Sequence, residues 1–154
     1  NCRIDGLNND KPDLIIIDRN LNTKKNLNFL NFSKQRKTYI FTTSRNIKKI
    51  NFFRKKKVNI IKIDRLESIN DFIFLLKEMY RLGKRRILVE SGLVFLNELL
   101  KLKIINNLYI FMSKKKLTKH GSNNIKINIL KRYKLNRKIK VNLKEDTLYK
   151  LEIR

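Results

Sequence analysis

The sequence has almost no cysteine, histidine or proline, and it contains no alanine or tryptophan. The single Cys2 excludes an internal disulfide, and Cys2 with His120, the only histidine, is too few ligands for a Cys/His zinc site. No stretch approaches the roughly 18 consecutive apolar residues that a membrane-spanning helix needs. We therefore expect a protein without a metal centre and without a membrane partner.

The remaining composition is that of a folded protein. The chain has 154 residues, 42% of them hydrophobic, with nine Phe and five Tyr, which excludes a disordered basic tail. One proline and four glycines leave no flexible linker, so we expect one domain over residues 1–154. No basic segment followed by an apolar one precedes Leu14, so we expect no signal peptide and a cytoplasmic location.

The net charge of +25 would ordinarily indicate nucleic acid or an anionic membrane as partner. However, the chain holds 26 Lys, 20 Asn and 21 Ile, residues with A/T-rich codons, so base-composition drift accounts for most of the charge. Lysine also outnumbers arginine 26 to 12, whereas bidentate phosphate and guanine recognition favours arginine. We expect no nucleic-acid partner; the alternative is a basic RNA-binding module that uses the lysine blocks at residues 48–57 and 114–119.

Short apolar runs alternate with amphipathic stretches along the chain. We expect strands at residues 14–17, 39–41, 58–63, 87–89 and 107–112. A helix should begin after Ser68 and end at Gly83, and a second should cover residues 95–102. This order predicts an α/β fold of three layers, with a mixed, mostly parallel sheet and helices on both faces. Residues 125–130 and 147–153 alternate in polarity and predict antiparallel strands at the C-terminal edge.

The best candidate site follows the apolar run 87–89. Glu90, Ser91 and Gly92 form a small-residue turn that leads directly into a helix, and free backbone N–H groups at such a turn suit a phosphate. Glu90 could accept hydrogen bonds from a substrate. The alternative is that Ser-Gly serves only the geometry of the turn.

A second candidate lies where the strand at residues 39–41 ends. Hydroxyl groups of Thr42, Thr43 and Ser44, with the guanidinium of Arg45, could hold the 2′-phosphate of NADPH. A polar loop that only caps the following helix would have the same residues. Arg19 ends the first strand at the same expected edge of the sheet.

Four pieces of the chain, taken in order, resemble one family. They are residues 1–6, 11–19, 86–92 and 108–112, and the third contains Val89-Glu90-Ser91-Gly92. In order and spacing they are similar to the reductase domain of the bifunctional riboflavin-biosynthesis deaminase/reductase. The resemblance implies a dihydrofolate-reductase-like fold.

The resemblance also implies an activity. It would be the NADPH-dependent reduction of 5-amino-6-(5-phosphoribosylamino)uracil to its ribitylamino product, with that phosphorylated substrate and NADPH as ligands and a homodimer as an expected assembly. Arg3 and Glu90 would bind substrate, and Arg19 would lie where the family contacts NADPH. The residues that would line NADPH after the turn are Gly92, Leu93, Val94, Phe95, Leu96, Asn97 and Glu98.

The chain departs from the family pattern in two places. Leu93 and Val94 replace the usual Pro and Thr, which removes a hydroxyl contact to the cofactor. This leaves open a noncatalytic relative of the reductase. The family's opening strand and its deaminase motif have no match, so we expect a fragment of a longer, two-domain protein.

Overall fold

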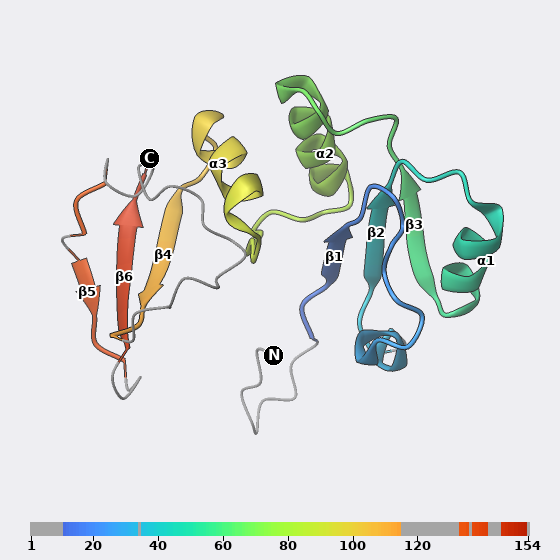
Figure 1. Cartoon of the computed structure of the whole chain (residues 1–154), viewed down its shortest axis with the longest axis horizontal. Coiled ribbons are helices and arrows are strands. Elements are labelled where there is room, and N and C mark those ends of the chain that lie inside the picture. The colour runs from blue at the N-terminus through green and yellow to red at the C-terminus, as the bar shows by residue number, and fades with distance from the viewer. Residues whose placement is uncertain (1–10, 34, 115–132, 136, 142–145, 154) are drawn as a thin grey trace. The chain divides into compact units, whose positions relative to one another are not determined.

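The computed structural model describes residues 11–33, 35–114, 133–135, 137–141 and 146–153 (Figure 1). The chain divides into two compact units, residues 1–85 and 86–154, and each is described by itself. The single domain over residues 1–154 stays a prediction.

The first unit contains a parallel three-stranded sheet in the order β1-β2-β3. Its strands are β1 (Leu14–Ile17), β2 (Thr38–Thr42) and β3 (Val58–Lys62). All five residues of β2 are buried, because a central strand of a parallel sheet is covered on both faces. The three expected strands are confirmed to within one residue at each end.

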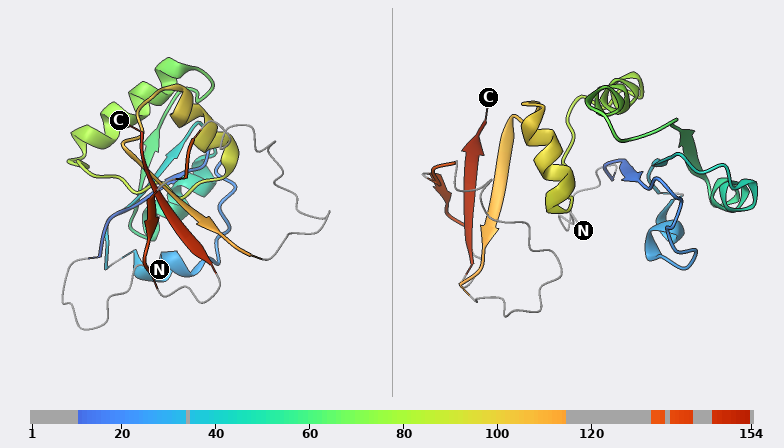
Figure 2. Two further views of the ribbon diagram at one scale, coloured as in Figure 1. Left: turned by 90° about the vertical axis from the view of Figure 1, so that its left-hand side faces the viewer. Right: turned by 45° about the horizontal axis from the view of Figure 1, so that its top comes forward.

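Three helical segments accompany this sheet: η1 (Asn28–Phe32), α1 (Ile47–Lys55) and α2 (Ile69–Arg81). α1 begins after Asn46, whose side chain accepts a hydrogen bond from the backbone N–H of Lys49 at 3.0 Å. Its residues Ile50 and Phe53 are buried and join Ile40 in the core, and α1 packs against β3. Figure 2 shows the same arrangement from two further directions.

α2 has the limits that the sequence predicts. Ser68 and Asp71 form a reciprocal capping box, in which each side chain accepts from the backbone of the other residue. Gly83, with φ of 79°, follows the helix end and adopts a left-handed conformation that glycine tolerates without strain. The buried stripe consists of Phe72, Leu75 and Met79.

The second unit contains α3 (Leu93–Lys101) and an antiparallel sheet in the order β4-β6-β5. Its strands are β4 (Asn107–Met112), β5 (Arg137–Ile139) and β6 (Thr147–Glu152). The antiparallel C-terminal strand expected at residues 147–153 is therefore confirmed. α3 begins two residues before the expected start, because Gly92 has the extended conformation of an N-cap.

The structure differs from the sequence expectations at residues 87–89. Residues 87–89 form no strand, and Ile87, Leu88 and Val89 have 41%, 69% and 46% of their surface exposed. An apolar run becomes a strand only beside a partner that takes its hydrogen bonds, and no described strand pairs with this one. The described parallel strands form the sheet of the first unit, and the described antiparallel strands form the sheet of the second unit. The strand expected at residues 125–130 lies outside the described residues.

Candidate functional site

The carboxyl ends of β1, β2 and β3 form one edge of the parallel sheet, where open α/β sheets usually bind ligands. Three residues predicted to bind cofactor meet at this edge. The hydroxyl of Thr42 donates to the carbonyl oxygen of Arg19 at 2.8 Å. The backbone N–H of Ser44 in turn donates to that hydroxyl at 3.2 Å. The sequence therefore predicted correctly that these residues share one edge.

Thr43 strengthens this connection between the ends of β1 and β2. Its backbone N–H and its hydroxyl both donate to the carbonyl oxygen of Arg19, at 3.0 and 2.9 Å. The backbone of Arg19 is thus held by three donors from the end of β2.

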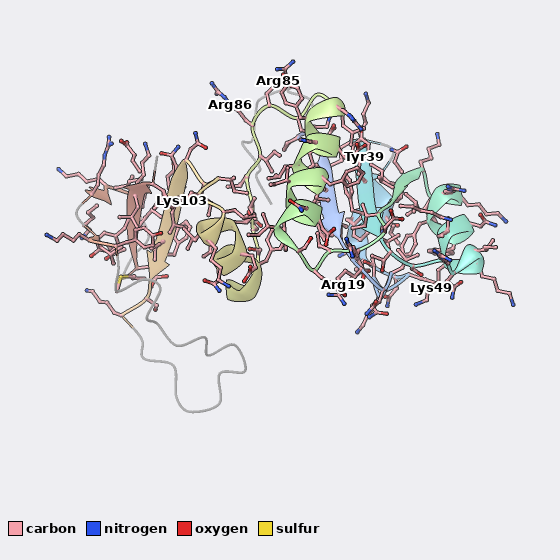
Figure 3. All side chains as sticks on the ribbon, turned by 90° about the horizontal axis from the view of Figure 1, so that it is seen from above. Arg19, Tyr39, Lys49, Arg85, Arg86 and Lys103 are labelled. Carbon is pink, nitrogen blue, oxygen red and sulfur yellow. The ribbon has the colours of Figure 1, made fainter. Side chains whose placement is uncertain are left out.

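The side chains at this edge differ in how much a ligand could reach. Thr42 is fully buried, and its hydroxyl is used within the protein. Ser44 is half-buried. The side chain of Arg19 is 51% exposed, and its guanidinium lies 3.9 Å from the carboxylate of Glu67, a distance typical of a weak surface ion pair (Figure 3). Arg45, also predicted for this site, is exposed as well, so Arg19 and Arg45 are both accessible cations here.

The turn after β1, residues 18–23, carries Arg19 and is fixed by Asp18. The carboxylate of Asp18 accepts hydrogen bonds from the backbone N–H and the hydroxyl of Thr23, both at 2.6 Å. Burial raises the pKa of Asp18, but the hydrogen bonds from Thr23 and from the backbone of Asn22, with the charge of Lys49, outweigh it and lower the pKa below its ordinary value. Asp18 is thus an ionised structural acceptor rather than a proton donor at neutral pH.

The second predicted site belongs to the second unit. Glu90 is exposed, in a segment without helix or strand, and Gly92 is the N-cap of α3. Gly92 has no side chain that could cap this end of α3, where the helix dipole is positive. An exposed carboxylate next to the positive end of a helix dipole can bind a ligand that carries both hydroxyl and phosphate groups.

The remaining predicted residues lie in or near α3. The backbones of Leu93 and Val94 form its first turn, and Phe95, Leu96 and Asn97 are half-buried. Glu98 pairs with Lys101 at 2.7 Å. Arg3 lies outside the described residues. The roles assigned to all these residues stay predictions.

Two residues of the first site were not predicted from the sequence. Lys49 and Thr23 both act on the turn after β1, and Lys49 does so from α1, across 28 positions of the chain. A sequence signal for α1 does exist. Asn46 is a favourable N-cap residue, and the apolar residues Ile50 and Phe53 follow it three positions apart, as on one face of a helix. In the basic block at residues 48–57, Ile50 and Phe53 face the core while most basic side chains are exposed.

The part of the chain that the structure describes has neither a metal-binding cluster nor a membrane-spanning helix. It contains no cluster of three or more His, Cys, Asp or Glu that could hold a metal ion. No described helix combines the length and the apolar character required to cross a bilayer.

Comparison with known proteins identifies the family. No curated protein matches the chain. The family described as the RibD C-terminal domain matches residues 1–121, which include both candidate sites and most of the 154 residues. The chain therefore belongs to the RibD C-terminal domain family.

Proposed function

We propose that this chain is an NADPH-dependent reductase that converts 5-amino-6-(5-phosphoribosylamino)uracil into its ribitylamino product. The family is one of reductase domains in riboflavin biosynthesis. The single observation that carries the proposal is the extent of the family match, which covers the edge of the parallel sheet and the segment from Glu90 into α3.

The donor groups of the two sites fit a dinucleotide phosphate and a sugar phosphate. Arg19 offers an exposed guanidinium and Ser44 a half-buried hydroxyl at the sheet edge. The N-terminal end of α3, where the helix dipole is positive, favours phosphate oxygens. Within the first unit, the sheet edge suits an anionic group such as the 2′-phosphate of NADPH. The family resemblance assigns residues 92–98 to NADPH, and Glu90 and Arg3 to the substrate.

The proposed reaction needs alignment of two ligands more than acid–base chemistry by the protein. NADPH, when bound, supplies a hydride. The C1′–O4′ bond of the ribosyl unit breaks, C1′ accepts the hydride to form a C1′–H bond, and O4′ takes up one proton. Glu90 would orient the substrate by accepting hydrogen bonds from its N–H or hydroxyl groups.

The direct test is to mix the full chain with NADPH and the deaminated substrate and to follow NADPH absorbance. We expect oxidation that depends on the substrate, with the ribitylamino product detected by mass spectrometry. A chain that is folded by circular dichroism but oxidises no NADPH would reject the proposal.

Replacing Glu90 separates a catalytic domain from a noncatalytic relative. Glu90→Gln removes the charge but keeps the size, and we expect a loss of at least about tenfold in kcat/KM, the effect of one charged hydrogen bond. Glu78→Gln is the matched control, since Glu78 lies on α2 and pairs with Arg81 there. Equal kcat/KM in both variants would reject Glu90 as a substrate-binding residue, whereas no turnover in the folded wild-type chain would favour the noncatalytic relative.

A further inference from the structure

The turn at residues 18–23 is held at both ends by groups from other elements. The end of β2 fixes the backbone of Arg19 through three hydrogen bonds. At the other end, the ammonium of Lys49 donates to the carbonyl oxygen of Leu21 at 3.0 Å, and its charge also acts on the carboxylate of Asp18. Arg19, whose backbone forms the first attachment, extends its exposed side chain from this turn (Figure 3).

Helix stability does not explain a lysine at position 49. Lys49 lies in the first turn of α1, where the helix dipole is positive and a cation is unfavourable. That turn contains no acidic residue to compensate. Its favourable contacts are instead with the neighbouring turn, through Leu21 and Asp18.

Attachment of the turn to the core does not require Lys49 either. Leu21 is fully buried and belongs to the hydrophobic core cluster with Ile40 and Phe53. A chain without the ammonium would therefore keep the turn on the core, but the Leu21 carbonyl would lose its donor and Asp18 its nearby charge. What Lys49 adds is a fixed geometry for the turn.

We infer that Lys49 is a positioning residue for the cofactor site: by fixing the turn after β1 it fixes the guanidinium of Arg19 for an anionic group of the cofactor. This inference rests on the proposed function, because it needs NADPH to bind at this edge. In this role Lys49 acts through the carbonyl oxygen of Leu21 and the carboxylate of Asp18.

The test compares Lys49→Met with Lys48→Met in the full chain. Lys48 is exposed in the same helix turn, so both variants remove one charge at the same end of α1. We expect Lys49→Met to raise the Kd for NADPH about tenfold, which corresponds to ~1.4 kcal/mol, with kcat changed less than about twofold. Lys48→Met should leave the Kd within about twofold of wild type, and Lys49→Arg, which keeps a donor and the charge, should recover most of the affinity.

Hydrogen exchange provides a readout that needs no cofactor. The backbone N–H of Thr23 donates to Asp18, so its exchange reports on the geometry of the turn, whereas the N–H of Ile40 in the central strand reports on global unfolding. In Lys49→Met we expect about tenfold faster exchange at Thr23, equivalent to ~1.4 kcal/mol, and unchanged exchange at Ile40. Acceleration at both positions would mean a folding role and overturn the inference.

Failure of the proposed function and failure of the positioning role can be told apart. A folded wild-type chain that binds no NADPH overturns the proposed function and this inference with it. A wild-type chain that binds NADPH, with equal affinity in Lys49→Met and Lys48→Met, overturns the positioning role alone.

Discussion

The hydrogen bond between Thr23 and Asp18 is the most informative single contact to remove. Thr23→Val replaces the hydroxyl by a methyl group and keeps the β-branched shape, so the backbone preference changes little. The variant leaves the backbone N–H of Thr23 bonded to Asp18 but deletes the 2.6 Å bond from its hydroxyl.

The expected loss follows from the charge and the burial of the pair. Hydrogen bonds to charged groups contribute about 1.5–3 kcal/mol, and both residues are half-buried, so we expect about 1.5 kcal/mol, the lower end of that range. The contribution also depends on pH. Because the pKa of Asp18 is lowered in the folded state, the stabilisation is present at neutral pH and is lost as the pH falls through the range in which Asp18 takes up a proton.

Urea unfolding followed by circular dichroism at neutral and acidic pH measures both effects. Thr23→Ser is the matched control, since serine keeps the hydroxyl donor, and it should lose less than half as much stability. If Thr23→Val and Thr23→Ser were equally stable at neutral pH, the Asp18 contact would contribute nothing and the reasoning on this turn would be refuted.

Three further predictions concern the first unit and use the same unfolding assay. Ser68→Ala removes one half of the capping box of α2 and should cost about 1 kcal/mol, whereas an unchanged midpoint would contradict the role of the cap. The backbone N–H of Glu67, and then that of Ser68, hold the pKa of Asp71 at about 2, so stability should fall as the pH drops from about 4 toward 2, and Asp71→Asn should flatten that slope. Phe53→Ala, at a fully buried ring, should cost about 3–5 kcal/mol, while Ile47→Ala on the same helix, 69% exposed, should change stability by less than about 0.5 kcal/mol; similar losses would show that α1 does not pack as described.

Local patterns predicted much of the fold because their physical causes are local. The strands at residues 14–17 and 107–112 were predicted with their observed limits, since each is a continuous apolar or alternating run. The limits of α2 followed from Ser68 and Gly83, whose cap and stop act within a few residues. The α/β class, the parallel sheet and the antiparallel C-terminal strand were correct, and the dihydrofolate-reductase-like fold agrees with the family.

The failures involve partners distant in the chain. The strand expected at residues 87–89 needs a neighbour to supply hydrogen bonds, and its own sequence cannot show whether one is present. β5, with only three residues, is too short to leave a periodic signal. Its pairing with β6 depends on register rather than on composition.

The candidate site was predicted in the same uneven way. Arg19, Thr42 and Ser44 were placed at one edge because parallel strands end together, and they do meet there. Lys49 was missed because its hydrogen bond to Leu21 joins segments 28 positions apart. Side chains that orient a loop from another element have no local pattern, so only a structure reveals them.

The backbone at Leu21 limits which sequences this protein can have. Leu21 is fully buried, yet its φ of 52° is a value that β-branched side chains rarely adopt. Isoleucine occurs 21 times in the chain, but it would strain the backbone at this position although its size and hydrophobicity match. Selection should therefore act against isoleucine at position 21, even where codon drift favours isoleucine in the rest of the chain. Related chains with the same composition bias should keep a residue without a branched Cβ at this position.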